Sequence, residues 1–252
     1  MTPAIASFVL VHGALGDSSA WKKVAPLLRE SGAVVATPDN PGAAADFEGG
    51  ARAPEFEDYV AAIEREIDAA PKPVVLVGYS SGGIIITQVA ENRPDDIAAL
   101  VYLCAYLPID GETLQGLTMS DEDSMIRARL RIDPATGKAG LSPEDMREII
   151  FHDCSPEDAA AGMAHTRPES LALLRAPVHS TGANFGRVPR YYITTLRDRA
   201  VSPALQKRMY ERTPVEKVYA IDSGHVPSFS RAGELATALL EIADAARTSH
   251  RR

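Results

Sequence analysis

The sequence predicts an α/β fold, with a mostly parallel sheet covered by helices on both faces. Short runs rich in apolar and β-branched residues recur along the chain, and segments with helical spacing separate them. The runs are apolar throughout instead of alternating with polar residues, which is typical of parallel strands buried on both sides. The predicted strands are Phe8–Val11, Ala33–Thr37, Val74–Val77, Leu100–Leu103, Tyr191–Thr195 and Lys217–Ile221.

Helices are predicted where apolar residues repeat at intervals of three or four. In the C-terminal helix, Leu235, Leu239 and Ile242 share a face opposite Glu234 and Glu241. The alternation of strand and helix favours strand–helix–strand units, and hence parallel strands. The predicted helices are Trp21–Ser31, Phe56–Ala70, Gly83–Asn92, Pro203–Arg212 and Ala232–Ala246.

Residues 108–188 interrupt this alternation, because they contain short helical patterns and no predicted strand. Two patterns begin with Ser-Pro-Glu-Asp, at Ser142 and Ser155, where serine caps a helix and proline suits its first position. We expect a helical lid over a site, since long insertions usually carry function; a peripheral helical subdomain is the alternative. The chain then forms one domain, with a core of residues 1–107 and 189–252 and a lid of residues 108–188.

Composition argues against several classes of protein. The 252 residues include 26 Lys and Arg against 34 Asp and Glu, and the net charge of −8 disfavours binding to nucleic acid or anionic lipid. The apolar runs are too short to span a membrane. No metal and no cofactor are predicted, because the HExxH, CxxC and strand-linked GxGxxG motifs are absent. No basic residue precedes the apolar segment Ile5–Val11, unlike in a secretory signal, so we expect a cytoplasmic protein.

The most informative segment is Gly78-Tyr-Ser80-Ser-Gly82, between a predicted strand and a predicted helix. This Gly-x-Ser-x-Gly pattern is typical of a nucleophile elbow, a tight turn that holds the serine hydroxyl above the sheet edge. Glycines two positions either side of the serine relieve the crowding that such a turn creates. A glycine-rich turn with an unreactive serine is the alternative interpretation.

A serine nucleophile creates an oxyanion, which needs two hydrogen-bond donors. The backbone N–H of Ser81 is one candidate, because it lies at the start of a helix. The other is the backbone N–H of Ala14, in the loop His12-Gly13-Ala14 after the first strand. Gly13 allows close approach there, and we expect His12 to be structural.

The serine also needs a neighbouring base, and His225 is the candidate among the six histidines. It lies in a loop after the last predicted strand, at the sheet edge that carries Ser80. The acid that orients the imidazole normally follows the penultimate strand, which gives Asp198. Asp222 is the rival, although its closeness to His225 in the chain makes a side-chain pair awkward. Structural, surface or substrate-contact roles are expected for His12, His152, His165, His179 and His250.

The chain resembles the α/β-hydrolases, in particular the group of plant methyl esterases and hydroxynitrile lyases with their bacterial relatives. The resemblance implies the α/β-hydrolase fold and ester hydrolysis through an acyl-enzyme, with Asp198 as the family acid and a helical lid over the acyl pocket. The matching segments are Phe8–Ala14 with Trp21, Val77–Gly83, Tyr191–Leu205 and Ser223–Val226.

Two positions separate esterases from lyases within this group. Cyanohydrin-cleaving members carry a threonine after the loop histidine and a lysine after the catalytic one, whereas this chain has Gly13 and Val226, as esterases do. Lyase activity is therefore disfavoured. The chain departs from the plant pattern at Gly16, near another histidine of plant members, and in having Trp21 as its only tryptophan. These departures leave the substrate open.

The leading interpretation is a carboxylesterase for small, fairly apolar esters, with a small-molecule ester as the predicted partner. Other triad chemistry is the alternative, namely a lactonase, C–C hydrolase, perhydrolase, cyclase or acyl transferase. A third hypothesis is a non-catalytic ligand receptor on a hydrolase fold. The sequence leaves the oligomeric state open, a homodimer included. The candidate substrate-binding residues are Gly13, Tyr106, Leu107, Met125, Phe151, Met163, Phe185 and Val226.

Overall fold

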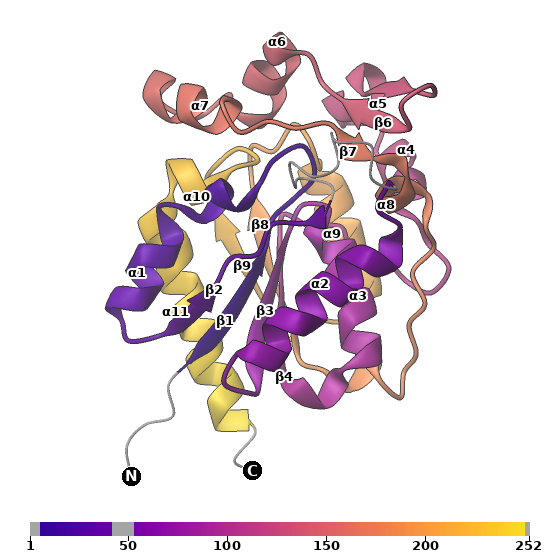
Figure 1. Cartoon of the computed structure of the whole chain (residues 1–252). Helices are drawn as coiled ribbons and strands as arrows, with labels where there is room; N and C mark the ends of the chain where they lie inside the picture. The colour runs from indigo at the N-terminus through magenta and orange to yellow at the C-terminus, as the bar shows by residue number, and fades with distance from the viewer. Residues whose placement is uncertain (1–5, 42–52, 250–252) are drawn as a thin grey trace.

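A six-stranded parallel sheet forms the centre of the molecule (Figure 1). The computed structural model describes residues 6–41 and 53–249, so the predicted role of His250 lies outside the described residues. The strand order is β2-β1-β3-β4-β8-β9. The strands are β1 (Ser7–Val11), β2 (Val34–Ala36), β3 (Val74–Tyr79), β4 (Ile97–Leu103), β8 (Arg190–Thr195) and β9 (Lys217–Ile221).

The strand order reverses between β1 and β3. The chain moves from β1 outward to β2 and then returns to place β3 on the other side of β1. At such a reversal the loops after the two neighbouring strands diverge and open a crevice at the carboxyl ends of the strands. The segment after β1 contains His12, Gly13 and Ala14, and the turn after β3 contains Ser80. The topology therefore brings the predicted oxyanion loop and the predicted nucleophile to one place.

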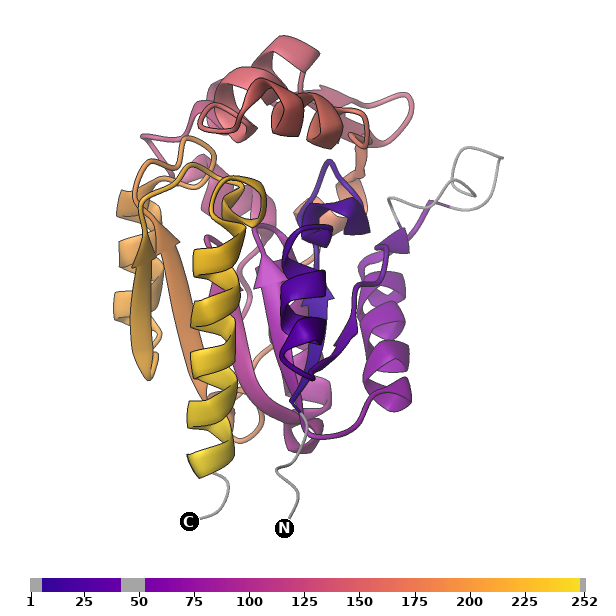
Figure 2. The same cartoon turned by 90° about the vertical axis from the view of Figure 1, so that its left-hand side faces the viewer.

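Helices cover both faces of the sheet, as the sequence predicts. One face carries α1 (Val24–Glu30) and α11 (Ala232–Ser249), which contact each other and stand in front of the sheet in Figure 2. The other face carries α2 (Phe56–Ala69), α3 (Gly82–Asn92) and α9 (Pro203–Arg212). Each pair of layers encloses its own apolar cluster, so both sides of the sheet are buried. Within the described residues, no helix is long and apolar enough to cross a bilayer.

The two edge strands differ from the prediction of fully buried strands. In β9, Lys217, Val218 and Ala220 are exposed, and in β2 Val34 is exposed. Each of these strands has a partner strand on one side only. Their apolar residues reflect strand propensity more than burial.

The insertion lies above the carboxyl ends of the strands (Figure 1). It carries a three-stranded antiparallel sheet in the order β5-β6-β7, so the prediction that residues 108–188 contain no strand was wrong. The last part, residues 176–189, returns along α3, where Thr181 N donates to Glu91 Oε2 at 2.7 Å. The elements are α4 (Leu114–Met119), α5 (Met125–Arg129), β5 (Arg131–Asp133), β6 (Lys138–Gly140), α6 (Pro143–Asp145), η5 (Met146–Ile150), α7 (Pro156–Met163), β7 (Glu169–Ser170) and α8 (Leu171–Arg175).

Short strands explain why this small sheet was missed. β5 and β6 have three residues each, too few to show an alternating pattern. In the structure, two features define the turn between these strands. Asp133 Oδ1 accepts a hydrogen bond from Ala135 N at 2.9 Å, and Gly137 has φ of 67°. The two Ser-Pro-Glu-Asp predictions were correct: Ser142 and Ser155 each cap a helix through the side chain.

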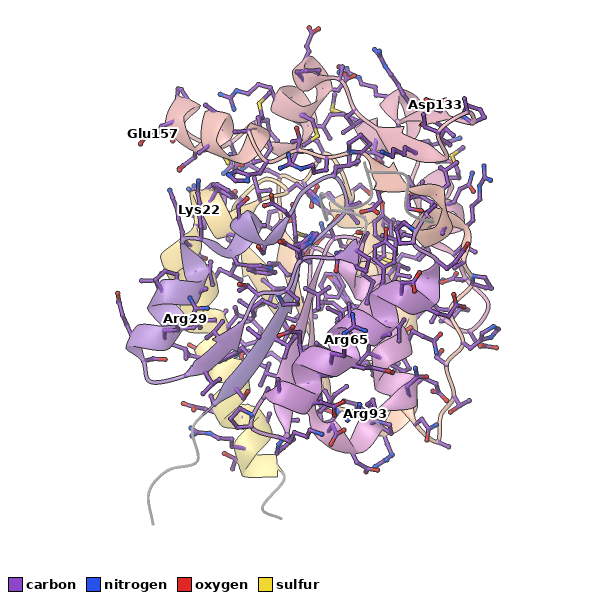
Figure 3. All side chains as sticks on the ribbon, viewed as in Figure 1. Lys22, Arg29, Arg65, Arg93, Asp133 and Glu157 are labelled. Carbon is purple, nitrogen blue, oxygen red and sulfur yellow. The ribbon has the colours of Figure 1, made fainter. Side chains whose placement is uncertain are left out.

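An ion pair fastens the lid to the core on the α1 side. Lys23 Nζ lies 2.6 Å from Asp158 Oδ1 of α7. Figure 3 labels their neighbours, Lys22 on the core and Glu157 on the lid.

The remaining elements are short. They are the 3-10 helices η1 (Ser18–Trp21), η4 (Pro94–Asp96) and η6 (Phe185–Arg187), and the helix α10 (Pro227–Ser230), which precedes α11.

We expect Gly83→Ala to destabilise the fold strongly, because α3 packs against the backbone at this point. A Cβ on Gly83 would lie 2.1 Å from the backbone oxygen of Tyr106, which cannot move without shifting the chain. Overpacking of this kind costs about 3 kcal/mol or more. Gly233→Ala is the matched control at the second position of α11, where a Cβ would meet nothing within 4 Å. Urea unfolding checks this, and equal stabilities of the two variants would contradict the packing argument.

Candidate active site

Ser80 occupies a strained turn between β3 and α3. Its φ of 54° lies in the left-handed region, which costs a non-glycine residue on the order of 1–2 kcal/mol. Backbone hydrogen bonds hold it there, from Ser80 N to Leu103 O and from Tyr106 N to Ser80 O, both at 3.1 Å. A Cβ on Gly78 would lie 2.8 Å from the carbonyl group of Gly82, and a Cβ on Gly82 would lie 2.9 Å from the backbone oxygen of Val11. Both glycines flanking the serine are therefore required by close approach, as expected of an elbow.

The side chains of Ser80, His225 and Asp198 form a continuous chain of contacts. His225 Nε2 lies 3.0 Å from Ser80 Oγ, and His225 Nδ1 lies 2.8 Å from Asp198 Oδ2. A carboxylate only accepts hydrogen bonds, so Nδ1 carries the proton and Nε2 is free to accept from the serine hydroxyl. His225 and Asp198 are both buried, whereas Ser80 is half-buried. This tautomer is the one that a general base toward Ser80 needs.

Neighbouring groups hold the Asp198 carboxylate at both oxygens. Oδ1 accepts from the backbone N–H groups of Ala200 and Val201, at 2.8 and 3.0 Å. Oδ2 accepts from Thr195 Oγ1 at 2.9 Å and Gln206 Nε2 at 3.2 Å, in addition to His225. Such hydrogen bonds fix the orientation of the carboxylate. Gln206, fully buried in α9, was not singled out by the sequence.

Asp222 lies away from this chain of contacts. Its Oδ1 pairs with Arg197 Nε at 2.7 Å, and its side chain is 72% exposed. Its position three residues before His225 therefore does not bring the two side chains together as a pair. The structure places Asp198, and not its rival, against the imidazole.

The two residues that carry the predicted oxyanion donors contact each other. The backbone N–H of Ala14 donates to Ser81 Oγ at 2.6 Å, so that donor already has a partner from the neighbouring loop. Close approach explains Gly13, because a Cβ there would lie 2.8 Å from Ser80 Cβ. Ser81 is buried, and its hydroxyl is a contact that the sequence analysis did not predict.

Hydrogen bonds of the His12 side chain hold the oxyanion loop in place. Its Nε2 accepts a hydrogen bond from Asn40 N at 2.9 Å, and its Nδ1 lies 2.7 Å from Gly13 O. Because Nε2 accepts, the proton lies on Nδ1 and is donated to Gly13 O. Burial lowers the pKa of His12, which is therefore neutral at pH 7. Asn40, also fully buried, donates through Nδ2 to His12 O at 3.1 Å.

The low pKa of His12 predicts a loss of stability in mild acid. In the unfolded chain this histidine takes up a proton near pH 6.5, whereas in the folded protein it does so only at lower pH. Its contribution to the free energy of unfolding is therefore complete above about pH 6.5 and declines as the pH falls below that value. Urea unfolding between pH 8 and pH 5 checks this on the wild type and His12→Gln. A pH dependence identical in both would contradict this assignment.

The lid holds the loop that carries His225. Asp153 Oδ2 accepts from Gly224 N at 2.7 Å and from Ser230 Oγ at 3.0 Å, and its side chain is only 2% exposed. The neighbouring His152 Nε2 lies 3.0 Å from Arg197 O. The residue before His225 is thus clamped by a buried carboxylate from the lid. No motif in the sequence singles out Asp153.

Two cavities border the oxyanion loop, and both are lined by Ala14 and Leu15. The larger has a volume of about 190 Å³ and lies between the elbow and the lid sheet. The smaller, of about 40 Å³, lies on the other side of the loop, beside Tyr79 and Phe229. The larger cavity is lined by, among others, Ala14, Ser80, Ser81, Tyr106, Leu114, Thr118, Leu130, Ala139, Glu169 and Leu174.

Half of the candidate substrate-binding residues line these cavities. Tyr106 borders the larger one, and Gly13, Phe151 and Val226 border the smaller one. The other half line neither of the two: Leu107, Met125, Met163 and Phe185. Leu107 and Phe185 belong to the apolar cluster on the α2 and α3 face, and Met125 and Met163 pack against the other cluster.

A buried thiol adjoins the imidazole. Within the described ranges, Cys104, Asp198 and His225 form a group whose potential ligand atoms lie within 4.8 Å of one another. Burial raises the pKa of the Cys104 thiol, so it stays protonated, and its sulfur lies 3.4 Å from the backbone oxygen of His225. The other two side chains contact each other directly. The group is thus accounted for by hydrogen bonds, and we assign no metal to it.

Comparisons with known proteins identify the family of the chain. Residues 8–238 match the α/β hydrolase family. The chain is 30% identical to putative methylesterase 14 of Arabidopsis thaliana, over 95% of this chain and 72% of the relative. It is 28% identical to the pyrethroid hydrolase of Sphingobium wenxiniae, over 96% and 89%. The crystal structure of a pyrethroid hydrolase from Sphingobium faniae superimposes with a TM-score of 0.85, at 26% identity, over 96% of this chain and 98% of that one.

The chain therefore belongs to the α/β hydrolase family, as the resemblance implied. Its relatives named methylesterase and pyrethroid hydrolase support ester hydrolysis as the class of activity.

Proposed function

We propose that Ser80, His225 and Asp198 are the catalytic triad of a carboxylesterase acting on small, fairly apolar esters. The observation that carries this proposal is the continuous chain of contacts from Ser80 Oγ through His225 to Asp198, beside a cavity that Ser80 lines. The strained backbone of Ser80 supports it, because strain is retained where a function requires the conformation.

The proposed reaction uses each atom of the chain in turn. Ser80 Oγ attacks the ester carbonyl carbon while His225 Nε2 takes the hydroxyl proton, and Asp198 stabilises the imidazolium without taking a proton itself. The imidazolium then gives that proton to the departing alcohol oxygen, which leaves an acyl group on Ser80. Water repeats the sequence, with His225 as its base, and releases the carboxylic acid.

The oxyanion is proposed to be held by the N–H groups of Ser81 and Ala14. Since Ala14 N–H is bonded to Ser81 Oγ, the substrate oxygen replaces that hydroxyl as the acceptor, and the Ser81 side chain turns aside. The donors are backbone groups, so Ser81→Ala retains both of them. This makes Ser81 a useful control for substitutions at Ser80.

Substrate size and class follow from the walls of the site. The larger cavity is bordered mainly by apolar side chains, which suits an apolar group of moderate size. The methylesterase and pyrethroid hydrolase relatives support methyl and aryl-alkyl esters as the first candidates. Lyase activity is disfavoured, because Gly13 and Val226 lack the threonine and lysine side chains that cyanohydrin-cleaving members carry at these positions. The cytoplasmic location stays a prediction.

A substrate panel tests this proposal. Wild type and Ser80→Ala are assayed with short-chain nitrophenyl esters, methyl esters, a pyrethroid, a lactone and mandelonitrile. We expect turnover of esters by the wild type, none by Ser80→Ala, and no cyanide release. Turnover of the lactone or cyanohydrin in preference to every ester would overturn the proposed activity in favour of other triad chemistry.

A further inference from the structure

A buried carboxyl group lies in the wall of the larger cavity. Glu169 opens the lid strand β7, is only 3% exposed, and lines the cavity that Ser80 also lines. Among the described residues that border this cavity, the other charged side chain is Arg127, which is exposed. An acidic group therefore stands in a mainly apolar chamber next to the proposed nucleophile.

Only one of its two oxygens is used by the protein. Tyr59 Oη donates to Glu169 Oε1 at 2.5 Å, and Ser170 N donates to the same oxygen at 2.9 Å. Within the described part of the chain, Oε2 accepts no hydrogen bond. It is also not one of the four side-chain atoms that are both sealed from solvent and unpaired there. Oε2 therefore keeps some accessible surface, and Glu169 borders the larger cavity.

Because Glu169 is charged, leaving its Oε2 without a hydrogen-bond donor costs free energy. Burial raises the pKa of Glu169 to about 6, against the lowering effect of the hydrogen bonds from Tyr59 and Ser170. At pH 7 to 8 the carboxylate is therefore mainly ionised, and a buried charge needs a full set of donors. In the part of the chain that the structure describes, the nearby ionisable groups are Tyr59 of α2, Arg127 of α5 and Lys138, which pairs with Ser170 in the lid sheet. A purely structural contact to Tyr59 would need only a neutral amide.

We propose that Glu169 Oε2 binds a hydrogen-bond donor, a hydroxyl or an ammonium group, on the part of the ester that occupies the larger cavity. This inference rests on the proposed esterase function and narrows its substrates to esters with one polar donor on an otherwise apolar group. The donor completes the coordination of the carboxylate and holds the ester in one orientation. Glu169 is then a specificity-determining residue, and Tyr59 positions it.

Binding to a variant that cannot turn over the ester tests the inference directly. Calorimetry on Ser80→Ala measures the affinity of methyl esters with four to ten carbons in the acyl chain, each compared with its ω-hydroxy and its ω-ammonio counterpart. We expect one chain length at which a donor tightens binding by about tenfold or more, the usual strength of a hydrogen bond to a buried charge. The two donor series show whether a neutral hydroxyl or an ammonium group is preferred.

Two further variants identify the group responsible. Adding Glu169→Gln keeps the acceptor for Tyr59 and Ser170 but replaces the second oxygen with an amide, so the preference for the donor is expected to disappear. Arg127→Gln is the matched control, because it changes the charge of the same cavity and should leave the preference intact. No preference at any chain length, or a preference lost with Arg127 and kept without Glu169, would overturn the inference.

Hydrolysis and stability separate this inference from its alternatives. If Ser80→Ala binds donor esters selectively but wild type hydrolyses no ester, the proposed reaction fails and the binding site stands. Glu169→Gln is also expected to raise Tm more at pH 8 than at pH 5. The raised pKa of Glu169 means that stability is lost as the pH rises through about 6. A lower Tm for Glu169→Gln at pH 8 would assign the carboxylate a structural role instead.

Discussion

Ser80→Ala is expected to lower kcat for ester hydrolysis by on the order of a million-fold, the effect of removing the serine from other triads. His225→Ala should cost a similar factor, because the hydroxyl without a base 3.0 Å away is a poor nucleophile. The double variant should be no slower than either single one, since the residues act as a unit. Steady-state assays with a nitrophenyl ester measure all three.

Ser81→Ala is the matched control for this experiment. It removes the neighbouring hydroxyl from the same turn and retains both backbone donors, so its kcat should stay within about tenfold of wild type. Circular dichroism and thermal unfolding establish that each variant is folded. A fully active Ser80→Ala, or a loss of activity confined to Ser81→Ala, would contradict the assignment of the nucleophile.

Asp198→Asn is expected to lower kcat by about ten thousand-fold while leaving the fold intact. The backbone N–H groups of Ala200 and Val201 both donate to Oδ1, so an asparagine would place its amide oxygen there. Its NH2 group would then face His225 Nδ1, which could no longer donate a proton to it. The imidazole would adopt the other tautomer, with its proton on Nε2, and lose the ability to accept from Ser80.

Asp222→Asn provides the control for this prediction. It removes the same charge one loop away, where the carboxylate is exposed and paired with Arg197, so activity should change less than about threefold. The ratio of kcat values for the two variants is the quantity to measure. If Asp222→Asn were the slower enzyme, Asp198 would not be the acid that orients His225.

The central sheet and the approach of three distant side chains could be predicted from the sequence. Ser80 and His225 each follow a strand of strong apolar pattern, and parallel strands bring their carboxyl ends to one edge. Asp198 was preferred to Asp222 from its place after the penultimate strand, and it is the one that contacts the imidazole. The sequence could identify these residues because the Gly-x-Ser-x-Gly turn and the loops after the last two predicted strands can be recognised from short segments of the chain.

The groups that surround them have no such signature. Asn40, Gln206 and Asp153 are polar residues buried by contacts that join segments far apart in the sequence. A single glutamine in an amphipathic helix is normally a surface residue, so nothing in α9 distinguishes Gln206 before its neighbours are known. Glu169 is a similar case, since two residues of lid strand give no pattern and its partner Tyr59 belongs to α2.

The substrate pocket was the least predictable part. Apolar residues in the lid were chosen by type, yet Leu107 and Phe185 fill the core between helices and sheet. Residues that line a cavity and residues that pack a core share the same chemistry. Which of them faces the empty space depends on how β5, β6 and β7 pair, and strands of two or three residues leave that undetermined in the sequence.

Intact-mass measurement after treatment with a fluorophosphonate tests the assignment of Ser80 as the nucleophile, because it reports an activated serine whatever the natural substrate is. Wild type and Ser81→Ala are expected to gain one phosphonyl adduct, whereas Ser80→Ala and His225→Ala should gain none. An unlabelled wild type, or an adduct that persists in Ser80→Ala, would contradict the assignment of Ser80 as a nucleophile activated by His225.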